Sequence, residues 1–355
     1  QNFVTYSLAD SELKIVHEVT DHEFVEVIPG QPRWHDGKIV SIIDNRQTDT
    51  RELQVAGRVI TPPGFQVMSV IDVTSDYIDV VATSDAVSRD VVRVGYDGSL
   101  TELAQGGVAG ATSTTGELQI LIESRLDTHS RTYQLRRGAK TEHYFESLAE
   151  TPSFQPQVHQ LKTGPNLVNT AVMFPRGHVL GSKKLPVMMR PYGGPHHSCV
   201  QNGALTYAID QWFADQGFVV IVADNRGTPG RGPAWDHAIY QDFVKPVLED
   251  QVHAIADVVA HFPSDVDAAR VGITGWSFGG YLSALAVLER PDVFHAAVAG
   301  APVTEWLWYD TAYTERYLGH PEKFPEVYAE NSLIGKASEL ERPLMLIHGL
   351  ADDNV

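Results

Sequence analysis

The sequence predicts two domains of different class: a β-domain made of repeated units over residues 1–152, followed by a mainly parallel α/β domain over residues 153–355. In the first part, strand-like runs recur about every 40 residues. In the second part, buried-type apolar runs alternate with helical patterns. The length of 355 residues also favours two domains, because single hydrophobic cores rarely grow that large.

The first domain repeats a pair of strand-like runs separated by a polar turn. The first runs begin at Lys38, Tyr77 and Leu118, in steps of 39 and 41 residues, and read KIVSIID, YIDVVATS and LQILIES. Their partners read TRELQV, RDVVRV and RTYQL. A four-stranded propeller blade repeats at about 40–50 residues, so the period favours the C-terminal blades of a β-propeller over a β-sandwich.

The repeat is incomplete at its beginning. FVTYSLADSELKIVHE, at residues 3–18, is typical of the last hairpin of a preceding blade. A propeller closes with about four to eight blades, so we expect further blades upstream. At the other end, the proline-containing stretch ETPSFQPQ, residues 150–157, predicts a linker to the second domain.

The second domain alternates buried-type strands with helices, which indicates a parallel sheet. The expected strands are LPVMMRPY (185–192), FVVIVADN (218–225), RVGITGW (270–276), AAVAGAP (296–302) and PLMLIHG (343–349). The expected helices cover 247–260 and 279–289, and the first has an apolar face.

One stretch of this domain, RVGITGWSFGGYLSAL, reads as a strand, a G-x-S-x-G turn and a helix. This is the context of the nucleophile elbow of an α/β hydrolase, and it predicts Ser277 as a nucleophile at the amino terminus of a helix. Gly275 and Gly279 avoid the clashes that a Cβ would cause in so tight a turn. The alternative is a packed turn without chemistry.

A serine nucleophile needs a base and an acid, which follow it in this fold in the order acid, then histidine. HGLADDNV, after the last expected strand, provides Asp352 and Asp353. His348 precedes both acids, so we interpret it as structural. The catalytic histidine is therefore expected beyond residue 355.

Composition excludes several classes of protein. The net charge of −18 argues against nucleic acid as a partner, because phosphate binding needs clustered Lys and Arg. The sequence contains neither a long apolar run typical of a membrane span nor a visible signal peptide. Cys199 is the single cysteine, which excludes an internal disulfide and favours a reducing, cytoplasmic compartment.

Several spaced motifs make residues 185–355 recognisable: YGGPHH, DNRGTPGRG, LEDQ, GWSFGGY, APVTEWLWYDTAYTERYLG and HGLADDNV. In this order they resemble the prolyl oligopeptidase family of serine peptidases, and most of all its dipeptidyl peptidase IV branch. For residues 1–150 the resemblance is limited to the propeller architecture.

The resemblance implies roles for individual residues. Ser277 matches the nucleophile and Asp352 the triad acid, in preference to Asp353. Tyr192 and the backbone N–H of Phe278 match the two donors to the oxyanion. The substrate-binding positions implied are Val303, Trp306, Tyr309, Tyr313, Arg316, Asn354 and Val355. Without the resemblance, WLWYDTAYTERY would read as an ordinary aromatic helix.

The resemblance predicts a serine exopeptidase that removes dipeptides after Pro or Ala through an acyl-enzyme, without a cofactor or metal, and that forms a homodimer when full length. His196 and His197 have no third metal ligand at useful spacing. Arg226, in the glycine-rich loop DNRGTPGRG, is interpreted as structural.

One departure keeps other functions open. The dipeptidyl branch binds the substrate amino group with paired glutamates, and this sequence contains no Glu-Glu pair. An acylaminoacyl peptidase or oligopeptidase of the same family, an esterase, and a non-enzymatic scaffold are the alternatives.

Overall fold

The computed structural model describes residues 2–6, 12–113, 118–138 and 140–355. The chain divides into two compact units. The first contains Gln1–Thr151 together with Gly230–His237, and the second contains Pro152–Pro229 together with Ala238–Val355.

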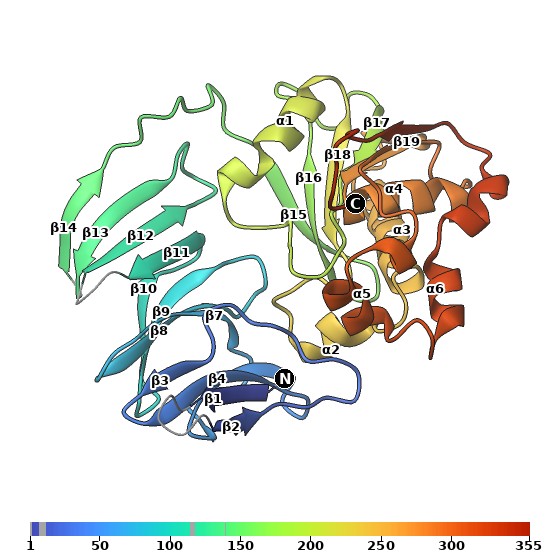
Figure 1. The fold of residues 1–355 in the computed structure, drawn as a ribbon. Helices are drawn as coiled ribbons and strands as arrows, with labels where there is room; N and C mark the ends of the chain where they lie inside the picture. The colour runs from blue at the N-terminus through green and yellow to red at the C-terminus, as the bar shows by residue number, and fades with distance from the viewer. Residues whose placement is uncertain (1, 7–11, 114–117, 139) are drawn as a thin grey trace. The chain divides into compact units, whose positions relative to one another are not determined.

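The first unit contains three four-stranded antiparallel sheets, in which neighbouring strands are also consecutive in the chain (Figure 1). Such meanders are the building units of a propeller. Their strands are β3 Arg33–His35, β4 Lys38–Asn45, β5 Thr50–Val55 and β6 Arg58–Val59; β7 Gln66–Val73, β8 Tyr77–Thr83, β9 Asp90–Gly95 and β10 Leu100–Ala104; and β11 Val108–Ser113, β12 Leu118–Ser124, β13 Thr132–Arg137 and β14 Lys140–Phe145.

The repeat predicted from the sequence corresponds to the two inner strands of each sheet. The first runs of the three pairs form β4, β8 and β12, and their partners form β5, β9 and β13. Each of these inner strands is paired along both of its edges. Leu53 and Ile78 are completely buried in one shared core.

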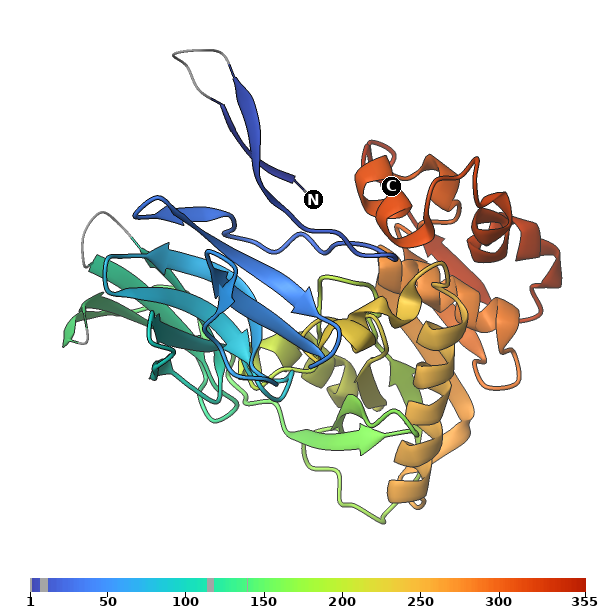
Figure 2. The ribbon, with the colours of Figure 1, turned by 90° about the horizontal axis from the view of Figure 1, so that it is seen from below.

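A separate hairpin precedes the three sheets. Its strands are β1 Asn2–Tyr6 and β2 Leu13–Glu18, which pair antiparallel and extend away from the sheets of this unit (Figure 2). This agrees with the hairpin expected over residues 3–18, although residues 7–11 of that prediction lie outside the described part of the chain.

The second unit is organised around a seven-stranded sheet of order β15-β16-β18-β17-β19-β20-β21. The five strands from β18 to β21 are parallel, whereas β16 is antiparallel to both of its neighbours. The strands are β15 Val158–Thr163, β16 Val168–Met173, β17 Leu185–Met189, β18 Val219–Asp224, β19 Val266–Trp276, β20 Ala296–Gly300 and β21 Leu344–Ile347.

Helices cover both faces of this sheet. Figure 1 shows α1 (Ala208–Asp215) on one face and both α3 (Lys245–His261) and α4 (Phe278–Glu289) on the other. The remaining helical segments are η1 Ala204–Tyr207, α2 Pro233–Asp236, η2 His237–Ile239, η3 Trp306–Trp308, α5 Thr311–Leu318, α6 Pro325–Asn331 and η4 Ile334–Glu339. All five predicted strands and both predicted helices are present.

Several features were not predicted from the sequence, among them the helices α1 and α6. Strands β15 and β16 follow the expected linker directly, and neither was identified. The segment Gly230–His237, which contains α2, groups with the first unit. There Arg51 is buried between Asp44 and Asp236, at 2.7 and 3.0 Å, and burial raises the pKa of Asp236 to about 8.

Within the described residues, no helix is both long enough and apolar enough to cross a membrane.

Candidate active site

Ser277 lies at the turn between β19 and α4, at the carboxyl end of a central parallel strand. Its backbone has φ 58° and ψ −117°, which is a strained conformation for a residue with a Cβ. Its N–H donates to the carbonyl of Gly300 at 2.9 Å, and its carbonyl accepts from Tyr281 at 2.9 Å. The side chain does not cap α4, so the turn presents the hydroxyl rather than using it for the helix.

The glycines around Ser277 are required by close packing. A Cβ on Gly279 would lie 2.7 Å from the carbonyl oxygen of Pro191. A Cβ on Gly275 would overlap the backbone of Gly279, and one on Gly280 would overlap the carbonyl of Gly300. The motif GWSFGG therefore specifies a turn that lies directly against two other loops of the sheet edge.

Tyr192 lies in the loop after β17, the strand beside β19. Burial raises the pKa of its phenol, with a smaller rise from Tyr309, while a hydrogen bond to the Ser277 side chain lowers it. The phenol therefore stays protonated near neutral pH and can donate a hydrogen bond. A Cβ on Gly194 would lie 2.7 Å from the ring of Phe278, so the Tyr192 loop packs directly on the first residue of α4.

Asp352 follows β21, two strands from β19, at the same carboxyl edge of the sheet. One carboxylate oxygen accepts the N–H groups of Val355 and Asn354, both at 3.0 Å. These bonds, with a smaller effect of His348, hold the pKa of Asp352 below its ordinary value. The other carboxylate oxygen lies 3.5 Å from Nε2 of His348.

An aromatic cluster lies beside the Ser277 turn. Trp306 is buried and stacks nearly parallel to Tyr313, with 6.1 Å between centroids and 13° between planes. Tyr309 meets both rings edge-on, at 5.9 and 5.5 Å. Phe243 and Phe278 complete the cluster from behind Trp306. Rings in these orientations stabilise one another, and we call Trp306, Tyr309 and Tyr313 the aromatic wall.

A cavity of about 210 Å³ lies next to this wall. It brings together three residues predicted for substrate binding: Val303, Tyr309 and Val355. It also contains residues that the sequence analysis did not select, namely Pro302, Thr304, Glu305, Trp308, Leu346 and His348. Only their place in the chain could have indicated these residues, because most of them come shortly after β20 or belong to β21 and the turn after it.

The other four predicted substrate positions do not line this cavity, and Tyr313 is one of them: it is half-buried and stacks on Trp306. Trp306 is almost completely buried, so it supports the pocket from behind. Arg316 lies on α5, with its guanidinium 5.9 Å from the ring of Tyr317. Asn354 is exposed beside Asp352.

The glycine-rich loop DNRGTPGRG holds the site together through polar contacts. Arg226 forms ion pairs with Asp250 at 3.0 Å and with Glu249 at 3.1 Å, as expected for a structural role. Asn225 donates to the carbonyl of Gly193 at 2.8 Å and accepts from Gln251 at 2.8 Å. Motifs DNRG and LEDQ thus anchor the loop that carries Tyr192.

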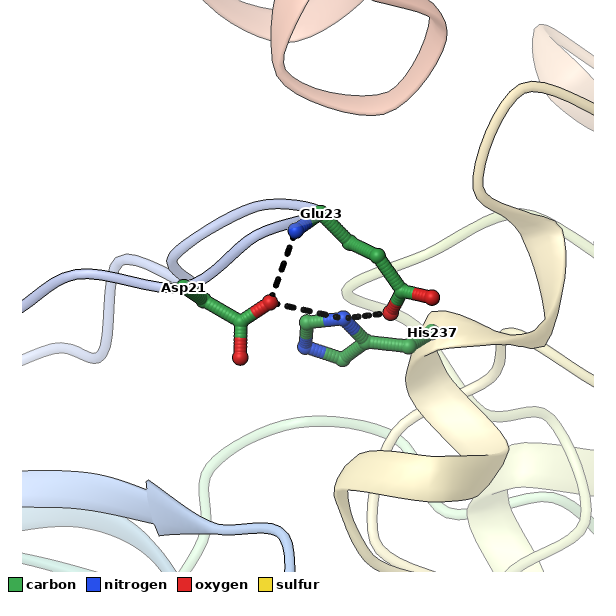
Figure 3. A group of neighbouring side chains, drawn as sticks. All are labelled: Asp21, Glu23 and His237. Atoms are coloured by element: carbon green, nitrogen blue, oxygen red, sulfur yellow. Dashed lines mark hydrogen bonds and ion pairs between the residues drawn. The ribbon is translucent and has the colours of Figure 1, made fainter.

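The first unit contains a different polar cluster, formed by Asp21, Glu23 and His237 (Figure 3). Their possible ligand atoms lie within 4.8 Å of one another, and His237 Nδ1 is 2.8 Å from Glu23. Because Arg46 forms ion pairs with both carboxylates and His237 forms a hydrogen bond with Glu23, we interpret the cluster as an ion-pair network rather than a metal site.

Comparison with known proteins places this site within a known family of peptidases. The sequence profile of the prolyl oligopeptidase family matches residues 206–355, a range that includes the Ser277 turn, the aromatic cluster and Asp352. Residues 206–355 belong to the prolyl oligopeptidase family.

Curated relatives include two kinds of peptidase. Dipeptidyl peptidase 8 of Mus musculus is 36% identical over 217 residues, covering 59% of this chain and 24% of the relative. Prolyl endopeptidase FAP of Homo sapiens is 35% identical over 177 residues, covering 49% of this chain and 23% of the relative. The probable dipeptidyl-aminopeptidase B of Aspergillus oryzae is 30% identical over 306 residues, covering 81% and 33%. The chain thus spans about a quarter to a third of the length of these relatives.

The fold is also shared with solved structures. A crystal structure of Porphyromonas gingivalis dipeptidyl peptidase 4 matches with a TM-score of 0.87 and 24% identity, over 99% of this chain and 52% of that chain. The likeness identifies the fold as propeller-type sheets followed by an α/β hydrolase domain.

Proposed function

We propose that the full-length protein is a serine exopeptidase that removes dipeptides from peptides with Pro or Ala before the scissile bond. The observation that carries this proposal is the strained turn at Ser277, which packs against the loop of Tyr192 beside an aromatic wall. The names of the relatives, which include dipeptidyl peptidases, support the same class of reaction.

The proposed reaction begins when the Ser277 hydroxyl attacks the scissile carbonyl and its proton passes to a histidine base outside residues 1–355. The negative oxygen of the tetrahedral intermediate accepts hydrogen bonds from Tyr192 and from the N–H of Phe278, the first residue of α4. The base then protonates the leaving amine, and an ester on Ser277 remains. Water hydrolyses this ester in the second half of the reaction.

The base is not His348 in this proposal. His348 and Asp352 are four residues apart on one turn, 3.5 Å from each other, and His348 faces the cavity. In α/β hydrolases the histidine follows the acid along the chain. Asp352 remains in the role of the acid that orients the imidazole and stabilises its cation.

Substrate preference follows from the aromatic wall. Tyr309, Tyr313 and Val303 offer rings and an apolar side chain, which suit a pyrrolidine ring or a methyl group without leaving polar groups unpaired. A homodimer and a reducing compartment such as the cytoplasm remain part of the proposal.

An alternative within the same family is an acylaminoacyl peptidase or an oligopeptidase. It is favoured by one observation, the lack of a Glu-Glu pair in the sequence. Under this alternative, the enzyme would accept substrates with a blocked amino terminus.

The test uses the full-length protein with chromogenic Xaa-Pro and Xaa-Ala amides, in free and acylated form. We expect release from the free dipeptide amides, with Pro preferred. Release only from acylated substrates would assign the alternative function. A fluorophosphonate probe separates both from a non-enzymatic scaffold, because a scaffold would leave Ser277 unlabelled.

A further inference from the structure

We propose that His196 positions the aromatic wall of the substrate pocket through a hydrogen bond to Tyr317 on α5. This inference rests on the proposed function of that wall, and it assigns a role to a histidine that the peptidase mechanism does not use. Under this proposal, the loop that carries Tyr192 also contacts α5 and holds its aromatic side chains in place.

The first step concerns the backbone of the loop. His196 has φ 71°, in the left-handed region that residues with a Cβ rarely adopt. The three residues before it, Gly193, Gly194 and Pro195, are buried. Surrounding contacts therefore hold His196 in a disfavoured conformation, and such positions occur where a side chain must be aimed.

The second step is the hydrogen bond itself. The ring of Tyr317 is completely buried, and its hydroxyl lies 2.6 Å from Nε2 of His196. A buried phenol without a partner is costly, so this bond fixes both side chains. Either atom can be the donor, according to which nitrogen of the imidazole carries the proton.

The third step connects this pair to the pocket. Tyr313 lies one helical turn before Tyr317 on α5, and the two rings meet edge-on at 5.1 Å. The ring of His196 also meets Tyr313 edge-on, at 5.9 Å and 80°. Together with Trp306 on its parallel side, these contacts restrict Tyr313 from three directions.

The same loop carries the proposed oxyanion donor four residues earlier. The ring of Tyr192 lies 6.3 Å from that of Phe278, and the ring of Phe278 lies 5.7 Å from that of Trp306, between centroids. His196 therefore links the group that binds the developing charge to the wall that binds the residue before the scissile bond. Loss of this link is expected to impair the discrimination between substrates more than the folding of the domain.

The experiment compares the wild type with His196→Ala, Tyr317→Phe and the double variant, in the full-length protein. Matched controls are His320→Ala, an exposed histidine just after α5, and Tyr328→Phe, which removes a different phenol hydrogen bond, to Gly319 at 2.8 Å. Rates are measured with the Xaa-Pro and Xaa-Ala amides.

We expect each single variant to lower kcat/KM for the Xaa-Pro amide by about tenfold and for the Xaa-Ala amide by less, because proline uses more of the Tyr313 ring. The double variant should lose no more than either single variant, since both remove one bond. His196→Gln, whose amide can accept from the phenol, should recover part of the Pro preference. The controls should keep the wild-type ratio.

A second measurement does not depend on peptidase activity. Nitration of Tyr313 by tetranitromethane, followed by peptide mapping, should be several-fold faster in His196→Ala and Tyr317→Phe than in the wild type and the controls. If the wild type cleaves neither amide but nitration responds as expected, the proposed function fails and the positioning role stands. If the Pro-to-Ala ratio and the nitration of Tyr313 are unchanged, or if the losses of the single variants add, the inference is wrong.

Discussion

The two turns that carry the proposed nucleophile and acid are built in different ways. The Ser277 turn is enclosed by buried backbone, so that a Cβ on the neighbouring glycines would overlap other loops. The Asp352 turn is exposed and follows β21, whose Met345 and Leu346 are 58% and 60% exposed. Its carboxylate is oriented by the N–H groups of the next residues.

This comparison teaches that the two groups depend on different parts of the molecule. The position of Ser277 is specified by packing between β19, α4 and two neighbouring loops, and it cannot change without displacing them. The position of Asp352 is specified by a local turn. Substitutions near Ser277 should therefore change both stability and activity, and substitutions near Asp352 should change activity alone.

The largest effect is expected for Ser277→Ala. Removing the nucleophile of a serine peptidase lowers kcat by roughly 10⁶-fold, and residual hydrolysis comes from binding and the oxyanion donors. The measurement is the steady-state rate with an Xaa-Pro amide, together with labelling by a fluorophosphonate. Labelling of the variant at a different serine would contradict the assignment of the nucleophile.

The next effect is expected for Asp352→Asn. The variant keeps the shape of the side chain but loses the charge that stabilises the imidazolium, which lowers kcat by roughly 10⁴-fold in serine peptidases. Because Asp352 is exposed, the thermal midpoint should stay near that of the wild type. Asp353→Asn is the matched control, and an equal loss in this control would overturn the choice between the two acids.

The difference in packing is tested by one pair of glycines. Gly280→Ala should destabilise the domain by about 1–3 kcal/mol, because the clash with Gly300 outweighs the better helix propensity of alanine. At Gly349, beside the acid, the nearest atom to an added Cβ is 3.8 Å away, and Gly349→Ala should change stability by less than about 0.5 kcal/mol. Both values come from denaturant unfolding. Equal losses would remove the distinction between the two turns.

The smallest effect concerns pH and His348. The pKa of Asp352 is lowered in the folded state, first by Val355 and Asn354 and only then by His348. A lowered carboxyl pKa stabilises the fold above the ordinary value of 3.8, and this contribution is lost as pH falls through the folded pKa. We therefore expect the small difference in unfolding free energy between the wild type and Asp352→Asn to stay constant from about pH 5 to about pH 8 and to shrink below about pH 4, as measured by denaturant unfolding.

His348→Ala should lower kcat/KM by less than about tenfold, because it removes only a weak, partly exposed contact to Asp352. The measurement is the pH profile with an Xaa-Pro amide. A loss comparable to that of Ser277→Ala would identify His348 as the base and contradict the proposed mechanism.

The spacing of apolar residues in the sequence predicted those strands and helices whose side chains are buried at regular intervals. The inner strands β4, β8 and β12 and the helices α3 and α4 were found in this way, because burial selects apolar residues at regular spacing. The strands β15 and β16 were not found. They lie next to the linker, and β15 is half exposed, so its apolar pattern is weak.

The sequence by itself determined the order of local elements: the strand, turn and helix around Ser277, the polar turn at Asp352 and the alternation of strands and helices, since these are visible as patterns within a few residues. The tertiary structure alone decided which side chains meet across the sheet edge. The hydrogen bond between His196 and Tyr317 joins segments more than a hundred residues apart. The burial of Trp306, and the place of Glu305 and Trp308 in the cavity, depend on how such segments pack. Such contacts arise from three-dimensional packing, which leaves no fixed spacing along the chain.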